Sequence, residues 1–310
     1  FGPKSCENIL KGVACLRRTS AYRLSHHAAE EAEHLRGALA KLPGVSQAVI
    51  AGDVRRRNEL VKDVVLVLVA ERPPEEVFDQ LRQVPGVSEF AGDDERRATL
   101  RFAGGGSAQI VVTPPSNLGA VLVQATGSDG HLAELVTRAK ARGATLSGAA
   151  LWQQGTGFVP TPDEASLYRA LGLPEIPPEL REGDGETERY AETVPALVEE
   201  GDLRGFLHCH TQYSDGSNTA EQLAIACRDA GYSYVGITDH SSTAAYAGGI
   251  RPEDLPRQWD EIDAANARLE GVRILKGIEA DILQDGGLDY EESLLQGFDF
   301  IIASVHSRFD

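Results

Sequence analysis

From Gly205 onward, the sequence alternates short apolar runs with longer amphipathic stretches. The apolar runs have the length of strands, and the amphipathic stretches have the periodicity of helices. This alternation predicts parallel strands joined by helices, in a βα barrel or an open sheet. The predicted strands are Gly205–Cys209, Tyr234–Thr238, Val272–Ile278 and Phe298–Val305, and the predicted helices are Thr219–Ala230 and Asp254–Leu269.

Each of these predicted strands carries or precedes a side chain that can bind a metal ion. His208 and His210 stand two residues apart on the first strand, so both point to the same side. Because the carboxyl ends of the strands of a βα barrel form one face, these groups should converge there. One such histidine is as often structural as metal-binding, but four at successive strand ends indicate a metal site. The candidate ligands, which are also the candidate catalytic residues, are His208, His210, Asp215, His240, Glu279 and His306.

The candidate ligands offer imidazole nitrogens and carboxylate oxygens. This mixture suits Mn²⁺, Zn²⁺ or iron, and a site for Mg²⁺ alone is less favoured. Such ions activate water as a nucleophile and neutralise the charge of phosphate oxygens. The predicted chemistry is therefore metal-dependent hydrolysis of a phosphate ester. Cys209 points to the other side of its strand, and we expect it to be buried rather than to bind a metal.

Four segments around these residues resemble the first motifs of the PHP (polymerase and histidinol phosphatase) domain. The resemblance implies a distorted βα barrel that holds up to three metal ions and hydrolyses phosphoesters. It also implies that Glu279 bridges two ions, and that the family's last ligands follow after Asp310. Since the chain has no methionine, we expect it to be an internal fragment with the first half of such a barrel. The segments are Phe206–Gly216, Ile237–Ser241, Gly277–Glu279 and Ala303–His306.

The residues before Gly205 form further blocks. Residues 1–42 have helical periodicity, with a helix expected over His26–Leu42. Residues 43–155 mix strand and helix patterns and predict an α+β domain, in which Val61–Ala70 suits a strand buried on both faces. Residues 156–204 are rich in proline and acidic residues, which is typical of a surface connection.

Several segments of these blocks resemble the bacterial family X DNA polymerases that end in a PHP domain. The resemblance implies a fingers-like segment with part of a helix-hairpin-helix in residues 1–42. It implies a palm of the nucleotidyltransferase (polymerase beta-like) fold in residues 43–155, the thumb end and an acidic linker in residues 156–204, and a truncated PHP domain in residues 205–310. The segments are Phe1–Lys4, Ala51–Asp63, Gln109–Pro115, Thr126–Ser128 and Leu171–Glu182.

The polymerase site of that family is degenerate in this sequence. Two metal ions at such a site require three carboxylates. Asp63 stands at the first expected position, but Val65 and Gln109 stand at the other two. The pair that would touch the triphosphate reads Gly52-Asp53, and Gln124-Ala125 replaces an aromatic pair. We therefore expect that polymerase activity is lost and that the palm serves as a DNA-binding platform.

The net charge of −17 argues against a simple nucleic-acid coat protein, which would be basic. The charge is uneven, because residues 1–70 hold 11 Lys and Arg against 7 Asp and Glu, and the remainder holds 19 against 40. In the more basic part, three arginines are candidates for phosphate contacts, with a solvated loop as the alternative. The candidate DNA contacts are Gly2, Lys4, Arg55, Arg56 and Arg57.

The leading function is removal of nucleotides, or of damaged groups, from DNA 3′ ends in base-excision repair, on gapped or damaged duplex. Three alternatives stay open: a gap-filling polymerase, a small-molecule phosphatase of the histidinol phosphate kind, and a DNA-binding scaffold without catalysis. No apolar stretch approaches the roughly 20 residues that cross a bilayer. The four cysteines do not predict a disulfide framework. We expect a cytoplasmic, nucleoid-associated protein.

Overall fold

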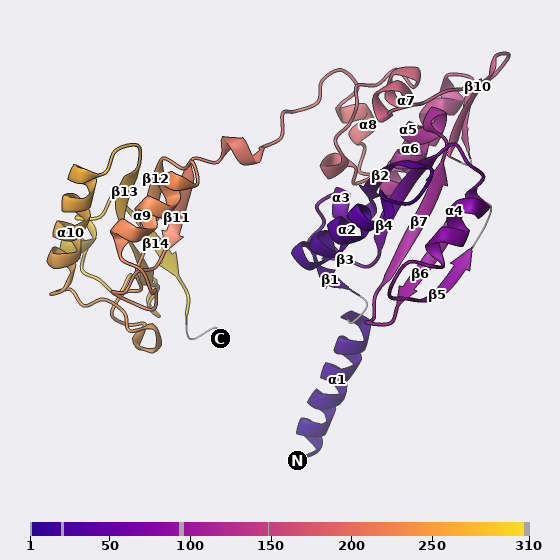
Figure 1. Cartoon of the computed structure of the whole chain (residues 1–310). Helices are drawn as coiled ribbons and strands as arrows, with labels where there is room; N and C mark the ends of the chain where they lie inside the picture. Colours follow the sequence, from indigo (N-terminus) through magenta and orange to yellow (C-terminus); the bar gives the residue numbers. More distant parts are fainter. Residues whose placement is uncertain (1, 20–21, 93–95, 148, 307–310) are drawn as a thin grey trace. The chain divides into compact units, whose positions relative to one another are not determined.

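The computed structural model describes residues 2–19, 22–92, 96–147 and 149–306. The chain divides into two compact units, Phe1–Pro195 and Ala196–Asp310, which we call unit 1 and unit 2 (Figure 1). The finer domain boundaries within unit 1 stay predictions. Within the described ranges, no helix is both long enough and apolar enough to cross a membrane.

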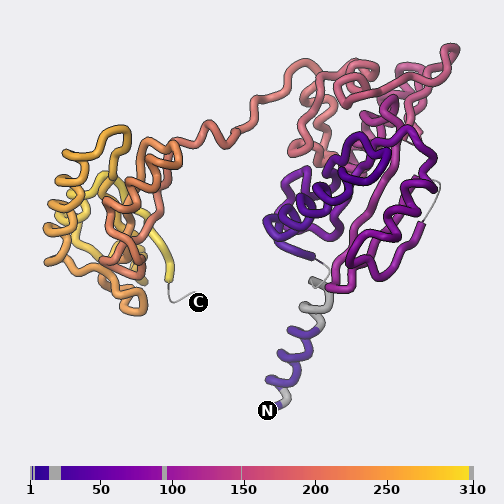
Figure 2. Tube along the Cα trace, viewed as in Figure 1, coloured from indigo at the N-terminus to yellow at the C-terminus, as the bar shows by residue number. Residues whose placement is uncertain are grey.

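Unit 1 is built on a five-stranded mixed sheet with the order β2-β4-β7-β6-β5. β4 and β7 are parallel and lie side by side although they are far apart in the sequence (Figures 1 and 2). The other neighbours are antiparallel, and β1 and β3 form a separate pair. The strands are β1 (Arg23–Leu24), β2 (Val45–Ala51), β3 (Leu60–Val61), β4 (Val64–Ala70), β5 (Val87–Gly92), β6 (Arg97–Phe102) and β7 (Ser107–Thr113).

The alternation of side chains along β4 explains why this strand is buried on both faces. Leu66 and Leu68 pack into a core with α2 and α4, and Val67 packs on the other face with Val121 of α5. Full burial of each such leucine contributes roughly 1.5–3 kcal/mol. The helices of this layer are α2 (Ser25–Leu39), α3 (Gly52–Arg55), α4 (Pro74–Leu81) and α5 (Leu118–Thr126).

The rest of unit 1 has its own core around a three-stranded antiparallel sheet, with the order β10-β9-β8. Leu135 of α6, Leu151 of β9 and Leu167 of α7 meet in this core. The elements are α6 (Asp129–Ala141), β8 (Ala144–Ser147), β9 (Ala150–Gln153), β10 (Gly157–Val159), α7 (Glu164–Ala170) and α8 (Glu186–Arg189), and α1 (Pro3–Thr19) precedes the sheet.

Unit 2 contains a four-stranded parallel sheet with the order β11-β12-β13-β14, which confirms the predicted strand and helix alternation. Ala224 of α9 and Ile262 of α10 pack with Val235 and Ile274 of the sheet. Thr219 caps α9, because its hydroxyl accepts the Gln222 backbone N–H at 3.1 Å. The elements are β11 (Gly205–Cys209), α9 (Ala220–Asp229), β12 (Tyr234–Ile237), α10 (Leu255–Arg268), β13 (Arg273–Asp281), α11 (Glu292–Leu295) and β14 (Phe300–Ser304).

The structure differs from the sequence prediction in unit 1. Val61–Ala70 was predicted as one strand, but the chain leaves the strand conformation at Lys62 and Asp63, between β3 and β4. Asp63 therefore lies at the amino end of β4. The strands β1, β5, β8, β9 and β10 were not predicted. β1, β8, β9 and β10 have only two to four residues, too few for a clear alternation in the sequence.

Candidate metal centre

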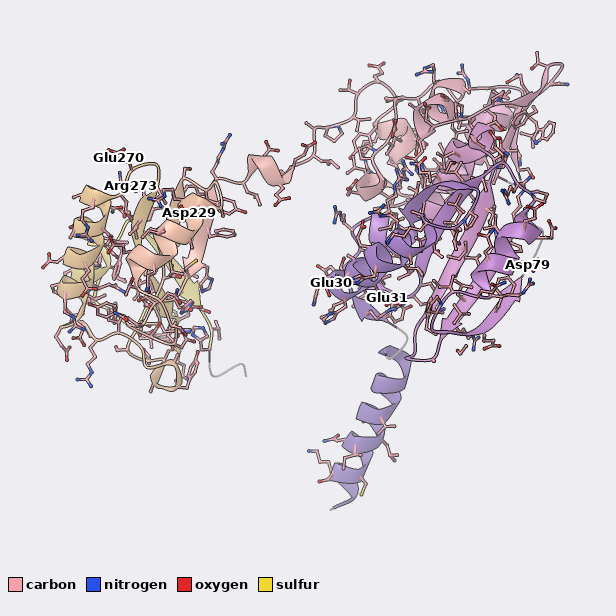
Figure 3. All side chains as sticks on the ribbon, viewed as in Figure 1. Glu30, Glu31, Asp79, Asp229, Glu270 and Arg273 are labelled. Atoms are coloured by element: carbon pink, nitrogen blue, oxygen red, sulfur yellow. The ribbon has the colours of Figure 1, made fainter. Side chains whose placement is uncertain are left out.

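All six candidate ligands lie at the end of the unit 2 sheet where the strands terminate. His210 directly follows β11, and His240 lies three residues after β12. Glu279 lies two residues before the end of β13, and His306 lies two residues after the end of β14. The opposite end of unit 2 carries Asp229, Glu270 and Arg273, which are labelled in Figure 3. We call the six residues the metal rim: His208, His210, Asp215, His240, Glu279 and His306.

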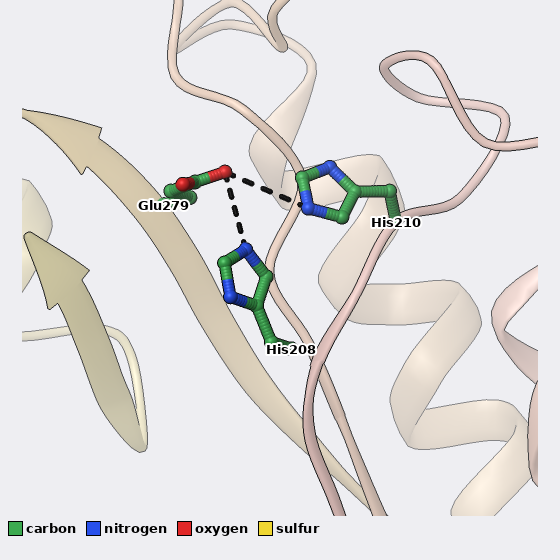
Figure 4. A group of neighbouring side chains, drawn as sticks. All are labelled: His208, His210 and Glu279. Atoms are coloured by element: carbon green, nitrogen blue, oxygen red, sulfur yellow. Dashed lines mark ion pairs between the residues drawn. The ribbon is translucent and has the colours of Figure 1, made fainter. Parts of the chain in front are cut away.

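Glu279 is the centre of the metal rim. Its Oε2 atom lies 3.3 Å from His208 Nε2, 3.5 Å from His210 Nε2 and 3.0 Å from His240 Nδ1. Figure 4 shows one oxygen of this carboxylate facing the rings of both His208 and His210. Its Oε1 atom faces the other way, 3.1 Å from His306 Nε2. The two oxygens thus face different histidines, as a carboxylate that bridges two ions would.

Asp215 completes a second group of ligand atoms. Its Oδ1 lies 3.1 Å from His210 Nδ1 and its Oδ2 lies 3.7 Å from His240 Nε2. His210 and His240 therefore each face Asp215 with one ring nitrogen and Glu279 with the other. Three overlapping groups of close donor atoms result: His208–His210–Glu279, His210–Asp215–His240 and His240–Glu279–His306.

The donor atoms of the metal rim fit divalent ions. Across the described residues, Nδ1 of His210, Nδ1 of His240 and Oε2 of Glu279 are buried polar atoms without a hydrogen-bond partner. Buried polar atoms are nearly always paired in folded proteins, so unpaired ones require an explanation. Ions held among these nitrogens and oxygens would satisfy all three atoms, and the donor set suits Mn²⁺ or Zn²⁺.

The charge states of His210 and Glu279 agree with this fit. Burial lowers the pKa of His210, and neighbouring His240 lowers it further, which favours the neutral ring with an available lone pair. Burial raises the pKa of Glu279, but contacts with His208 and Ser304 outweigh it, and the net shift is downward. The pKa of His306 shifts in the opposite sense: the hydrogen bond to Asp281 raises it, so an ion bound by this ring would have to displace a proton.

Two acids that the sequence analysis did not assign support the rim. Asp239 is fully buried and accepts four hydrogen bonds of 2.6 Å, from the Thr211 backbone and hydroxyl, the Ser214 hydroxyl and the Gln258 amide. It thereby holds the loop that carries Asp215. Asp281 lies 2.5 Å from His306 Nδ1 and orients that ring, as carboxylates behind metal-binding histidines commonly do.

Tyr246 and Cys209 lie close to the rim without contributing donor atoms to its three groups. The ring of Tyr246 is 5.8 Å from that of His240 and 6.0 Å from that of His306. Desolvation raises the pKa of Tyr246, and the carboxylates of Asp281, Glu279 and Asp215 add to this shift. Cys209 packs with the core beneath α9 and α10, as predicted from strand alternation.

The degenerate polymerase positions also come together, in unit 1. They line a cleft of about 530 Å³, which we call the unit 1 cleft. Val65 and Gln109 are register partners on β4 and β7. The Asp63 carboxylate accepts hydrogen bonds from Ser107 Oγ at 3.0 Å and from Gln109 Nε2 at 3.2 Å. The amide of Gln109 thus occupies the position where the resemblance to family X polymerases implies a third carboxylate.

The neighbouring arginines are bound within unit 1. Arg55 makes a bidentate ion pair with Glu164 at 2.7 and 2.6 Å. Its side chain is therefore not part of a solvated loop, which was the alternative to a phosphate contact. Arg56 pairs with Asp53 and donates to the Thr126 carbonyl at 2.7 Å inside the unit 1 cleft. Arg57 is exposed. Their contacts with DNA stay predictions.

The other residues considered from the sequence lie at the start of α1 or in the core of unit 1. Gly2 and Lys4 are exposed at the start of α1, and Phe1 lies outside the described residues. At the start of α6, the backbone N–H of His131 donates to Ser128 Oγ, which caps the helix. The ring of His131 is fully buried between Glu186 and Tyr168, at 2.7 and 2.8 Å. Glu186 and Tyr168 are distant in the sequence, so the local pattern could not reveal this cluster.

Comparison with protein families places known domains on both units. The DNA polymerase beta thumb matches residues 121–182, and the PHP domain matches residues 207–310. A Bacillus subtilis protein named DNA polymerase/3′-5′ exonuclease PolX is 36% identical over 313 residues, which cover 100% of this chain. Together, these matches support a family X polymerase with a PHP domain.

The chain spans only part of the length of these relatives. The chain spans 55% of the B. subtilis protein. Two proteins named probable phosphatase match the PHP domain alone: that of Caldicellulosiruptor saccharolyticus is 31% identical over 32% of this chain and 40% of its own. That of Acetivibrio thermocellus is 36% identical over 32% of this chain and 39% of its own. The family's PHP domain is metal-dependent, in agreement with the donor groups of the rim.

Proposed function

We propose that the chain is the metal-binding part of a DNA phosphodiesterase that acts as a 3′–5′ exonuclease or trims damaged 3′ ends during base-excision repair. The observation that carries this proposal is the convergence of five donor side chains with Glu279. Among the described residues, Nδ1 of His210, Nδ1 of His240 and Oε2 of Glu279 are buried and have no hydrogen-bond partner. Catalysis would be assigned to His208, His210, Asp215, His240, Glu279 and His306 as metal ligands.

The rim combines a buried interior with an open exterior. The side chain of Glu279 is 5% exposed, whereas those of His208 and Asp215 are 48% and 52% exposed. A phosphate could therefore reach the rim from solvent while Glu279 holds the centre in a dry environment. When bound, divalent ions would supply positive charge for the phosphate oxygens and acidity for an attacking water. Mn²⁺ or Zn²⁺ fits the nitrogen-rich donor set best, with iron as a third option and up to three ions per intact domain.

DNA is proposed as the substrate because the PHP domain is joined to a polymerase beta thumb. The name of the B. subtilis relative, which includes 3′-5′ exonuclease, supports this choice. Unit 1 would then hold gapped or damaged duplex, with Gly2, Lys4 and Arg57 as contacts. Such an enzyme would work in the cytoplasm, at the nucleoid.

We further propose that unit 1 does not polymerise DNA. Gln109 satisfies Asp63 by a hydrogen bond, and Val65 contributes no oxygen. In the same cleft, Arg56 neutralises Asp53, so the position that would meet a triphosphate is filled by an internal ion pair. Incorporation of dNTPs with Mn²⁺ would contradict this part of the proposal and support the gap-filling alternative.

A second candidate function is a small-molecule phosphatase, which the names of the PHP-only relatives favour. The two functions differ in substrate. A phosphatase would hydrolyse histidinol phosphate faster than the terminal phosphodiester of DNA, and a nuclease would do the reverse.

The proposal is tested with the full-length protein, Mn²⁺ and 3′-labelled DNA. We expect His210→Ala to reduce hydrolysis below detection while DNA binding persists, because unit 1 carries the proposed platform. Cys209→Ala is the matched control, since Cys209 is adjacent in sequence but packs into the core. Equal hydrolysis by His210→Ala and the wild type would refute the site. Hydrolysis of histidinol phosphate alone would refute the substrate.

A further inference from the structure

Tyr246 is an exposed aromatic side chain beside the metal rim. It lies in a short 3₁₀ turn, Ala245–Ala247, between β12 and α10, and it is 71% exposed. Its ring meets those of His240 and His306 at interplanar angles of 63° and 69°. These contacts fix the ring beside two candidate ligands and leave most of its surface open to solvent.

The loop that carries Tyr246 is anchored on both sides of the turn. The Ile250 N–H donates to the His240 carbonyl at 2.8 Å, and Tyr290 donates its hydroxyl to the Ile250 carbonyl. A Cβ atom at Gly249 would lie 1.8 Å from the Ser241 carbonyl oxygen, so the close approach of these two segments requires glycine. Such anchoring holds Tyr246 in a defined position over the rim.

An exposed aromatic ring in a defined position is suited to stack on another planar group. In a nucleotide, one sugar separates the phosphate from the base. If the phosphate is held at the metal rim, the base can therefore reach a side chain next to the rim, such as Tyr246. Every nucleobase has a π face, so such stacking needs no particular sequence. The remaining side chains of the rim are imidazoles and carboxylates, which offer donor atoms to metal ions and no aromatic surface as exposed as that of Tyr246.

We propose that Tyr246 stacks on the nucleobase of the terminal nucleotide and thereby makes the rim prefer nucleotides over other phosphate esters. This inference rests on the proposed function and names the substrate feature that the site reads. The phenol hydroxyl has no role in it, and the aromatic face carries the effect. Base stacking on an aromatic side chain strengthens binding by about 5- to 150-fold per base.

The test compares two ligands that differ only in the base: thymidine 5′-monophosphate and 2-deoxyribose 5-phosphate. Their dissociation constants are measured by calorimetry with the chain in Mn²⁺. In the wild type and in Tyr246→Phe, we expect the nucleotide to bind about 5- to 150-fold more tightly than the sugar phosphate. In Tyr246→Leu, the two should bind alike, with the sugar phosphate unchanged.

Tyr232→Leu is the control, because Tyr232 is also an aromatic residue of unit 2 but packs on Phe206, next to the strand starts. It should keep the preference for the nucleotide. A preference that persists in Tyr246→Leu, or that disappears in Tyr246→Phe, would overturn the stacking role while the metal site stands. If neither ligand binds the wild type, the proposed phosphoesterase site fails, and the stacking role fails with it.

Discussion

The metal rim of unit 2 and the cleft of unit 1 both gather acidic side chains at one end of adjacent parallel strands, but they treat those side chains differently. In the rim, Glu279 faces four histidines and its Oε2 atom has no hydrogen-bond partner among the described residues. In the cleft, Asp63 and Asp53 are each occupied by protein donors. The groups of close donor atoms found in the described part of the chain all lie in unit 2.

This comparison teaches that the number of acids in a pocket does not decide whether it binds metal. What matters is whether the protein itself satisfies them. Charges satisfied internally contribute to stability, and charges left open are available for a ligand. Substitutions in the two units should therefore affect different properties: the stability of unit 1 and the metal affinity of unit 2.

The largest effect on stability is expected from Glu164→Gln in unit 1. Glu164 is 4% exposed and pairs with Arg55 and with Arg181, whose side chain is 0% exposed. A neutral amide would leave the buried guanidinium of Arg181 without its charged partner, which costs about 3–5 kcal/mol. Urea unfolding of unit 1 measures this loss, with exposed Glu179→Gln as the control. A loss below about 1 kcal/mol would contradict internal satisfaction of the charge.

Asp281→Asn should weaken metal binding without unfolding unit 2. The asparagine can still accept from His306 Nδ1 but lacks the charge that raises the pKa of this ring. We expect about a 10- to 100-fold loss of Mn²⁺ affinity, as is typical for carboxylates behind metal-binding histidines. A chelator competition measures it. Asp260→Asn, an exposed position of α10, should leave the affinity unchanged, and an equal loss in both variants would contradict the account.

The stability of unit 1 should depend on pH through His131. Burial lowers the pKa of this ring, and Arg181 lowers it further against the opposing contacts with Glu186 and Glu134. The unfolded chain therefore binds a proton more readily. As pH falls below about 6.5, the free energy of unfolding should drop by up to about 1.4 kcal/mol per pH unit. Denaturation at pH 7 and pH 5.5 measures the slope.

A second titratable group, Glu164, affects the stability of unit 1 at lower pH than His131 does, so the two contributions can be separated. Burial raises the pKa of Glu164, but contacts with Arg55 and Arg181 outweigh it and the net shift is downward. Its contribution is complete above about pH 4.3 and is lost as pH falls further. His131→Gln should thus remove the slope between pH 7 and 5.5, and exposed His34→Gln should keep it. An unchanged slope in His131→Gln would contradict this assignment.

The smallest effect is expected from Gln109→Asp, which makes the unit 1 cleft more like the rim. It removes the hydrogen bond to Asp63 and places a second carboxylate beside it, at a cost of about 1 kcal/mol. Mn²⁺ should restore the melting temperature of this variant and leave that of wild-type unit 1 unchanged. Gln47→Asp, exposed on β2, controls for the added charge alone. No response of Gln109→Asp to Mn²⁺ would break the comparison.

The convergence of the six candidate ligands could be predicted because each one stands at a strand end or in the loop that follows it, and parallel strands bring these ends together. His208 and His210 share a strand face, and the others follow or end parallel strands. The supporting groups could not be predicted. Asp239 receives its donors from residues 19 to 28 positions away, and Arg55 meets Glu164 across 109 positions. Such pairings depend on how strands and loops pack, which local patterns do not encode.

The central claim is that the open acids and histidines of unit 2 hold metal while the satisfied acids of unit 1 do not. Anomalous diffraction from crystals soaked in Mn²⁺ tests both halves in one experiment. We predict manganese peaks at the metal rim, beside Glu279 and its histidines, and none beside Asp63 in the unit 1 cleft. A rim without manganese, or manganese bound only at Asp63, would contradict the account.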